Sequence, residues 1–341
     1  MPVRKISSRD VAQKAGLSQT TVSYVLNGRE DVAIPAATRQ RVLEAARELG
    51  YRVNSSARTM RSGRFGTVAL LLSENPAMSL LPAERREGIL DALEARGMHL
   101  LLSRFSDSTL TDHAQMPRIL QELRADGLLI NYNANLPEQM AELIAQNAIP
   151  AVWMNSRQPA DCVFPNDQDA GRRATEYLLS LGHRRIAFAI HSVTGHYSYT
   201  DRKAGYAAAM RKAGYPSQEL RLWTDLPQPL RAEMPLDWLQ GETSVTAILA
   251  YSPDSVVPLT LAAVSRGLSI PGDLSLLTFA AHPPDMGGAS VGTLLLPERE
   301  IGRRSAELLL RKIEDPAQTF PPVALPLELT AGDTCAAPQR R

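Results

Sequence analysis

A short segment near the N-terminus concentrates side chains that form hydrogen bonds. Residues 1–64 hold twelve Lys and Arg against five Asp and Glu, a net charge of +7, whereas the other 277 residues carry −6. A polar helix face inside this basic segment favours contact with a polyanion such as DNA over a helical bundle whose polar face meets only water. The face consists of amide, hydroxyl and phenol side chains, on Gln19, Thr20, Thr21, Ser23, Tyr24 and Asn27.

Helix signals around these residues predict a helix-turn-helix. Ser7 and Asp10 are spaced as a capping box that starts a first helix, and Gly16 is placed to end it in a left-handed turn. Ser18 then caps the second helix, which would enter the major groove of DNA. A third helix is predicted from Pro35 to Gly50, with an apolar stripe of Val42, Leu43, Ala46 and Leu49.

The same stretch resembles the N-terminal signature of the LacI/GalR transcription repressors. The resemblance covers roughly 55 residues and is carried by Asp10–Ser18, Thr21–Gly28, Thr38–Val42, Ala45-Ala46, Leu49–Tyr51, Asn54 and Ala57-Arg58. In that family the first residues of the second helix, and one residue a turn later, contact base edges. These positions match Gln19, Thr20 and Tyr24.

The three matched side chains differ in what they can recognise. Gln19 is able to bind adenine through two hydrogen bonds, and Thr20 to hydrogen-bond a base or pack on a thymine methyl group. Tyr24 replaces the Arg or His that family members often carry, and a phenol cannot form a bidentate contact with guanine. The preferred base at that step therefore stays open. We expect Ser18, Thr21, Ser23 and Asn27 to position phosphates or cap helices.

Residues 54–61 match the hinge helix of the family, a segment too short to be stable alone in water. The resemblance implies that it folds when two copies meet in the minor groove, with Asn54 and Arg58 at the DNA. Met60 occupies the position of the apolar wedge that opens the central base step. Val53 replaces the usual Pro and should leave the linker less stiff. An ordinary flexible basic linker is the alternative.

From residue 66 onward short apolar runs alternate with helical segments, which predicts two open parallel α/β sheets. The fold class is thus a small all-α helix-turn-helix domain followed by a two-lobed α/β domain. Strands are expected at 68–72, 99–102, 127–130, 151–154, 186–190, 247–250 and 274–277. Helices are expected at 84–96, 113–125, 137–147, 168–181, 201–213 and 254–267, and from Ile301.

The resemblance implies a body similar to periplasmic sugar-binding proteins, which dimerises and binds a small effector between its lobes. The expected domains are 1–53 for DNA binding, 54–65 for the hinge and linker, and 66–341 for the body. Because the lobes exchange crossover segments, lobe 1 should contain about 66–163 and 294–322. Lobe 2 should contain about 164–293 and 323–332.

Arg202 matches the effector-binding arginine of the family, where it would hold a hydroxyl pair or a carboxylate; a surface ion pair with Asp201 or Asp169 is the alternative. Ala280 and Ala281 stand where the family usually has Asp. Three explanations stay open: an anionic effector, a pocket that uses other side chains, or the loss of effector binding. The candidate pocket residues are Ser73, Asn75, Arg202, Trp223, Tyr251, Asp254 and His282.

Other functional classes lack support in the sequence. No apolar run approaches the ~18–20 residues of a membrane span, and Met1–Asp10 lacks the apolar core of a signal peptide. The two cysteines, Cys162 and Cys335, indicate neither a disulfide framework nor a metal cluster. We expect a cytoplasmic, homodimeric repressor that binds a pseudo-palindromic operator and is gated by a small carbohydrate-like effector, a sugar or an anionic sugar derivative. We expect no cofactor, metal or enzymatic activity. The alternative is an effector-independent regulator whose body only dimerises.

Overall fold

The structure is a computed structural model of the chain. It describes residues 6–27, 29, 32–51, 63–75, 79–132, 136–190, 195–222 and 245–339. The chain forms two compact units, a head of Met1–Phe65 and a body of Gly66–Arg341. Within the described ranges, no helix is both long enough and apolar enough to cross a bilayer.

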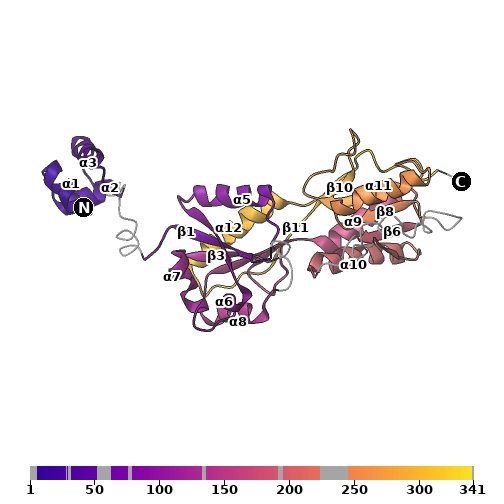
Figure 1. Ribbon diagram of the computed structural model, residues 1–341, viewed down its shortest axis with the longest axis horizontal. Helices are drawn as coiled ribbons and strands as arrows, with labels where there is room; N and C mark the ends of the chain where they lie inside the picture. Colours follow the sequence, from indigo (N-terminus) through magenta and orange to yellow (C-terminus); the bar gives the residue numbers. More distant parts are fainter. Residues whose placement is uncertain are drawn as a thin grey trace. The chain divides into compact units, whose positions relative to one another are not determined.

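The head consists of three helices around one small core (Figure 1). Val11, Val22 and Val42, one from each helix, are completely buried at its centre. Leu43 departs from the predicted apolar stripe, because 50% of its surface is exposed. Ala45 fills that place in the core, one turn beyond Val42. The helices are α1 (Ser8–Ala15), α2 (Gln19–Leu26) and α3 (Ala36–Glu48).

The predicted caps set the helix ends of the head. The backbone N–H of Ser7 donates to Asp10 Oδ2 at 2.8 Å and that of Asp10 donates to Ser7 Oγ at 3.4 Å, which is the capping box. Gly16 ends α1 with a φ of 62°. Ser18 Oγ accepts from the Thr21 N–H at 3.0 Å and starts α2. These contacts confirm the helix-turn-helix boundaries drawn from the sequence.

The body contains two six-stranded sheets with the same strand arrangement. The first sheet has the order β11-β5-β4-β3-β1-β2, and the second has β12-β10-β9-β8-β6-β7. All pairings are parallel except that of β10 with β12. Sheet 1 contains β1 (Thr67–Ser73), β2 (His99–Phe105), β3 (Gly127–Asn131), β4 (Ala151–Met154), β5 (Cys162–Pro165) and β11 (Val323–Leu325). Sheet 2 contains β6 (Ile186–Ile190), β7 (Gln218–Arg221), β8 (Ala247–Ala250), β9 (Ser275–Ala280), β10 (Gly292–Leu295) and β12 (Glu328–Thr330).

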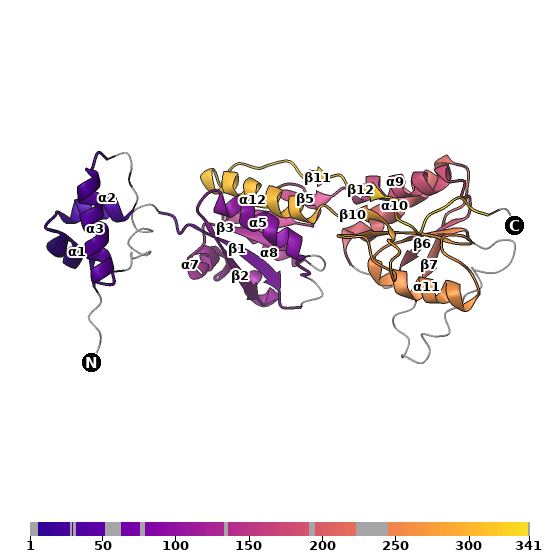
Figure 2. The same cartoon turned by 90° about the horizontal axis from the view of Figure 1, so that it is seen from above.

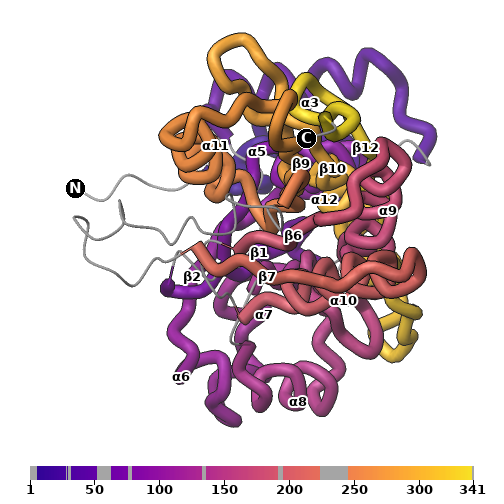
Figure 3. Tube along the Cα trace, turned by 90° about the vertical axis from the view of Figure 1, so that its right-hand side faces the viewer, coloured from indigo at the N-terminus to yellow at the C-terminus, as the bar shows by residue number. Residues whose placement is uncertain are grey.

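Helices cover both faces of each sheet, so each lobe has a core on either side of its strands (Figures 1 and 2). In lobe 2, α9 and α11 lie on opposite sides of the strands, as the end-on view shows (Figure 3). The helices of lobe 1 are α5 (Ala83–Glu94), α6 (Asp107–Leu110), α7 (Ile119–Leu123), α8 (Glu138–Gln146) and α12 (Glu298–Glu314). Those of lobe 2 are α9 (Asp167–Ser180), α10 (Tyr197–Lys212) and α11 (Val256–Ser265). A short 3₁₀ turn, Met116–Arg118, precedes α7 in lobe 1, and another, Pro253–Ser255, precedes α11 in lobe 2.

The chain crosses between the lobes three times, after β5, after β10 and between β11 and β12. Two of the expected lobe boundaries were therefore misplaced by a few residues. Leu294 and Leu295 pair with β9 and belong to lobe 2, whereas Val323–Leu325 pairs with β5 and belongs to lobe 1. The first crossover also lies slightly later than expected, because β5 extends to Pro165.

Several predicted elements change in detail. The single helix expected at 113–125 is a 3₁₀ turn followed by the five-residue helix α7, because Pro117 lacks the N–H that a longer helix needs. Helix α10 begins at Tyr197, four residues before the expected start. The short strands β5, β7, β10, β11 and β12 were not predicted. They have three or four residues each, too few for a periodic pattern.

Candidate DNA-binding surface and effector cleft

The start of α2 presents two exposed side chains, Gln19 and Thr20. Gln19 Nε2 donates to Ser8 Oγ at 2.9 Å, so its amide is held against the beginning of α1. The carbonyl oxygen of the same amide and the hydroxyl of Thr20 are polar groups of the type that contact base edges. Two of the three expected base-reading residues therefore lie on the surface, next to each other.

Tyr24 lies one turn later on α2 and is half-buried. The guanidinium carbon of Arg29 lies 5.7 Å from the centre of its ring, a cation–π contact that places positive charge beside the phenol. Arg39 on α3 binds two residues that precede this helix, because its Nη2 donates to the carbonyls of Arg29 at 2.7 Å and Val32 at 3.3 Å. The sequence pattern did not single out Arg29 or Arg39.

Four polar residues, two in α2 and two at its caps, bond to the helix or to each other. Ser18 Oγ lies 2.9 Å from Thr21 Oγ1, and Asn27 Nδ2 donates to the Ser23 carbonyl at 2.5 Å. We expected Ser18, Thr21, Ser23 and Asn27 to cap helices or to position phosphates. The observed contacts are of the capping kind, and contact with phosphates stays a prediction. Asn54, Arg58 and Met60 lie outside the described residues.

In lobe 2, Arg202 is buried, with 6% of its surface exposed. Its Nε donates to Asp167 Oδ1 at 2.6 Å and its Nη1 to the Tyr251 carbonyl at 2.7 Å. The aromatic rings of Tyr251 and Phe279 cover the guanidinium at 5.0 Å and 4.3 Å. Neither of the ion-pair partners considered from the sequence, Asp201 or Asp169, is the one found. Arg202 is thus already neutralised by a buried carboxylate.

A chain of hydrogen bonds connects this site to lobe 1. Tyr251 Oη lies 2.9 Å from Ser198 Oγ, and Ser198 Oγ lies 2.7 Å from His196 Nδ1. His196 Nε2 lies 2.8 Å from the carbonyl of Asn155, in the loop after β4. Because a carbonyl only accepts, Nε2 carries the proton and Nδ1 is the acceptor. His196 and Ser198 were not predicted from the sequence, because their partners Asn155 and Tyr251 are 41 and 53 positions away.

Burial lowers the pKa of His196, and the nearby cations Arg202 and Arg85 lower it further. The Asn155 carbonyl and the Asp167 carboxylate act in the opposite direction. Arg85 belongs to lobe 1 and Arg202 to lobe 2, so charges from both lobes act on one imidazole. The imidazole of His196, which lies where the two lobes meet, is therefore neutral at neutral pH.

Lobe 1 contains a second buried ion pair that the sequence did not reveal. Arg85 has 2% of its surface exposed; its Nε and Nη2 donate to Glu298 Oε2 at 2.8 Å and 2.6 Å. Its Nη1 donates to Asn131 Oδ1 at 2.7 Å. Ser79 Oγ donates to the Asn131 carbonyl at 2.6 Å and accepts from the Ser73 N–H at 2.7 Å. Ser73, the last residue of β1, therefore belongs to the hydrogen-bond network of Ser79 and Asn131.

The two ion pairs occupy equivalent places in the two lobes. Asn131 ends β3 and Tyr251 directly follows β8, and these strands have the same position in their sheets. In both lobes the Arg lies three residues before a glycine, and the carboxylate lies four residues before a glycine. The two lobes thus share the same arrangement of strands, glycines and buried ion pair.

The remaining candidate residues do not gather around Arg202. His282 Nε2 lies 2.8 Å from Glu84 Oε1 at an exposed contact between the lobes. Asp254 and Asn75 are exposed, and the Asn75 N–H donates to Ser73 Oγ at 3.2 Å. Trp223 lies outside the described residues. Among the predicted pocket residues that the structure describes, Arg202 contacts Tyr251 and Asn75 contacts Ser73, but these two pairs belong to different lobes.

The fold should lose stability at mildly acidic pH through a second buried histidine, His183. Its Nε2 donates to the Ala336 carbonyl at 2.9 Å and its Nδ1 lies 2.9 Å from Thr246 Oγ1, which ties the C-terminal segment to sheet 2. Burial lowers the pKa of His183. The unfolded chain therefore binds protons below pH ~6.5 that the folded chain excludes, and stability falls from there as the pH decreases.

Melting temperatures between pH 7.5 and 5.5 test this expectation. The variant His183→Asn should flatten the pH dependence, whereas His99→Asn, on an exposed strand end, should leave it unchanged. An identical pH dependence in wild type and His183→Asn would show that His183 carries none of it.

Comparison with known proteins places the chain in a family. Residues 8–54 match the model described as bacterial regulatory proteins, lacI family, and residues 175–335 match a periplasmic binding protein-like domain. The transcriptional regulator GntR of Pseudomonas aeruginosa is 30% identical over 311 residues, which cover 89% of this chain and 88% of that protein. The chain belongs to the lacI family. It is a DNA-binding transcription regulator.

Other lacI-family relatives and structures agree. The transcriptional repressor PurR of Vibrio parahaemolyticus is 27% identical over 316 residues, covering 90% of this chain and 92% of that protein. MalI of Escherichia coli K12, a maltose regulon regulatory protein, is 28% identical over 325 residues, covering 91% and 93%. A lac repressor dimer bound to operator and an anti-inducer has the same fold, with a TM-score of 0.77, 22% identity, and coverage of 98% and 100%.

Proposed function

We propose that this regulator is a homodimeric repressor that binds a pseudo-palindromic operator and is gated by a small effector between its lobes. The observation that carries the proposal is the exposed start of α2, where Gln19 and Thr20 lie on a capped, rigidly packed helix-turn-helix. A solved relative, the lac repressor, is described as a dimer on its operator. A dimer with two such helices reads two half-sites about one DNA turn apart.

The proposed dimer interface is an apolar side of the body. On α11, Val257, Leu261 and Val264 follow each other at helical spacing and are 62%, 65% and 64% exposed. On the edge strand β2, Leu101 and Leu102 are also exposed. Figures 2 and 3 show α11 and β2 on the same side of the body. Large apolar side chains in such an array favour burial against a second copy.

For the effector, the geometry around Arg202 weighs against the first explanation, an anion bound by this arginine. An anion would have to compete with Asp167, which already holds the guanidinium at 2.6 Å. The second oxygen of Asp167 and the Tyr197 hydroxyl are both buried without a close hydrogen-bond partner among the described residues. They lie near each other, since burial and the adjacent Asp167 carboxylate raise the pKa of Tyr197. An acceptor of this kind suits a ligand that donates hydrogen bonds. We therefore favour an uncharged effector with hydroxyl groups over an anion at Arg202.

Operator binding tests the proposal. The operator is selected from random duplexes with the full-length protein, and its affinity is measured in wild type, in Gln19→Ala and in Gln13→Ala. Gln13 is exposed on α1 and serves as the matched control. Loss of a bidentate base contact should weaken binding about tenfold or more. Equal affinities for all three proteins, or an affinity independent of salt concentration, would contradict DNA reading by α2.

The rival function is an operator-binding dimer without an effector. It is motivated by Ala280 and Ala281, which lack the polar groups of the matching family positions. Thermal unfolding of the full chain against a panel of sugars, sugar acids and sugar phosphates separates the two. An effector at ~100 times its dissociation constant adds ~2.7 kcal/mol of stability. No shift with any compound would favour the rival.

A further inference from the structure

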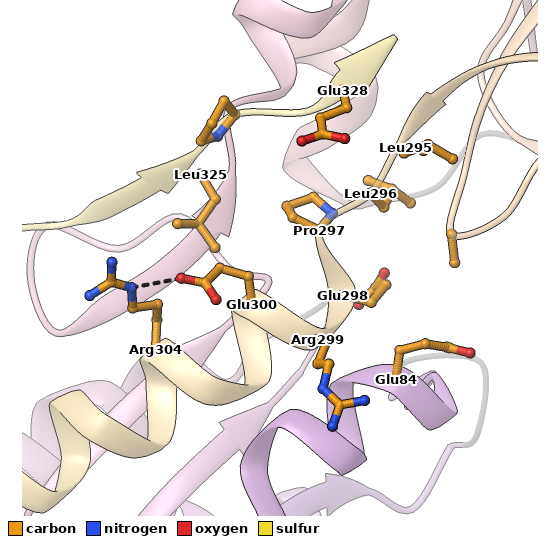
Figure 4. Close-up of a pocket in the computed structure, with 12 residues that line it drawn as sticks. Glu84, Leu295, Leu296, Pro297, Glu298, Arg299, Glu300, Arg304, Leu325 and Glu328 are labelled. Atoms are coloured by element: carbon orange, nitrogen blue, oxygen red, sulfur yellow. Dashed lines mark hydrogen bonds and ion pairs between the residues drawn. The ribbon is translucent and has the colours of Figure 1, made fainter. Parts of the chain in front are cut away.

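A cavity of about 590 Å³ lies where the chain passes between the lobes, and we call it the crossover cavity (Figure 4). Its apolar wall is formed by Leu295, Leu296 and Pro297 of one crossover segment and by Leu325 and Pro326 of another. Cavities of this size hold small organic molecules. The apolar wall indicates that such a molecule has an apolar body.

The crossover cavity is separate from the Arg202 site. None of the residues that line it is among the contacts of Arg202, which are Asp167, Tyr251 and Phe279. Ala281 and Glu84 line it, whereas His282, a neighbour of both, closes a contact between the lobes by bonding to Glu84. One of the residues expected at an effector site thus lies beside this second cavity.

Most charges around the crossover cavity already have fixed partners. Glu298 holds the buried Arg85, and Glu84 holds His282. Glu300 pairs with Arg303 and with Arg304, a contact drawn in Figure 4. Arg299, the other lining cation, pairs with Asp91. No lining arginine is therefore available to an anion.

Glu328 is the exception among the lining charges. Its carboxylate forms no ion pair or hydrogen bond with any residue that the structure describes. In the antiparallel pairing of β10 and β12 it lies directly opposite Leu295, so a negative charge adjoins the apolar wall. A ligand that satisfies both groups carries a cation at one end and an apolar body at the other.

We propose that the crossover cavity binds a small organic cation, an amine with an apolar or aromatic body, whose ammonium group pairs with Glu328. The body of the amine packs on Leu296, Pro297 and Leu325. The site goes beyond operator recognition and the effector cleft. Because an occupant contacts two of the three segments that join the lobes, it fixes the angle between them, which makes the cavity a second place of regulation.

The test uses 2-phenylethylamine and the full-length protein, with binding measured by calorimetry and ligand-observed NMR. We expect saturable binding of the amine, and weaker binding of 2-phenylethanol and phenylacetate, which lack the positive charge. Glu328→Gln should raise the dissociation constant of the amine by about threefold to fivefold, as expected for the loss of an exposed ion pair. Ala281→Phe, which places an aromatic ring in the space that the amine would occupy, should abolish binding. Glu138→Gln, an exposed glutamate at the start of α8, is the control and should change nothing.

Two results would overturn the proposal: no saturable binding of the amine at about 10 mM, the weak end of measurable affinities, or binding that persists in Ala281→Phe. Operator affinity is measured on the same protein preparations, so that either of these results can be told apart from a failure of the proposed function. A protein that binds operator normally and ignores the amine contradicts only the cavity proposal.

Discussion

Leu261→Asp should turn the protein into a monomer and weaken operator binding by about 100-fold or more, because one half-site contact replaces two linked ones. Leu261 is at the centre of the exposed row on α11, between Val257 and Val264. In the proposed dimer its side chain would be buried against the partner copy, and a carboxylate there would lose its hydration without gaining an ion pair. Sedimentation gives the mass and a DNA-binding titration gives the affinity.

The control is Gln139→Asp, which adds the same charge at an exposed position of α8. It should leave both mass and affinity unchanged. Since Leu261 is 65% exposed in the single chain, its replacement does not disturb the core of the lobe. A Leu261→Asp protein that remains a dimer with normal operator affinity would show that α11 is not the interface.

Arg85→Met should lower the free energy of unfolding of the body by about 3–5 kcal/mol, the usual cost of breaking a buried ion pair from one side. The substitution leaves the Glu298 carboxylate buried without its cation and also removes the contact to Asn131. Urea unfolding of the full chain measures the change. Arg299→Met breaks the exposed pair with Asp91 and should cost less than ~1 kcal/mol.

A second variant separates charge burial from lost packing. In Arg85→Met with Glu298→Leu, no unpaired carboxylate remains, so much of the lost stability should return. If the double variant is as unstable as the sum of the two single variants, packing rather than the ion pair explains the loss. If Arg85→Met is as stable as wild type, the buried pair contributes nothing.

Close helix packing surrounds this pair. A Cβ atom added to Gly88 would lie 2.0 Å from the Arg299 carbonyl, and one added to Gly302 would lie 2.0 Å from the Arg85 carbonyl. Helices α5 and α12 therefore touch backbone to backbone, and only glycine fits at both positions. Gly171 and Gly205 make the corresponding contact between α9 and α10 in lobe 2.

The sequence by itself determined the head and the fold class of the body. A cap such as Ser7 with Asp10, or a left-handed Gly16, depends on residues three or four positions apart, and these local interactions are readable in one chain. Strands such as β1 and β6 were recognised because strands buried on both faces are continuous apolar runs. The same local rule failed at β11 and β12, which are too short to show a pattern.

Tertiary structure alone decided the partners of the charged residues and the crossover cavity. Asp167 and Arg202 are 35 positions apart, and Arg85 and Glu298 are 213 apart. Arg85 is buried and Arg86 beside it is not. The glycine three residues after Arg85 is a local difference between them, but it does not identify the carboxylate that Arg85 binds. Which side chain is buried, and against which carboxylate, depends on how the crossovers return α12 to lobe 1. Pairings between distant segments are set by the packing of whole elements, and the spacing of neighbouring residues does not specify which elements pack together.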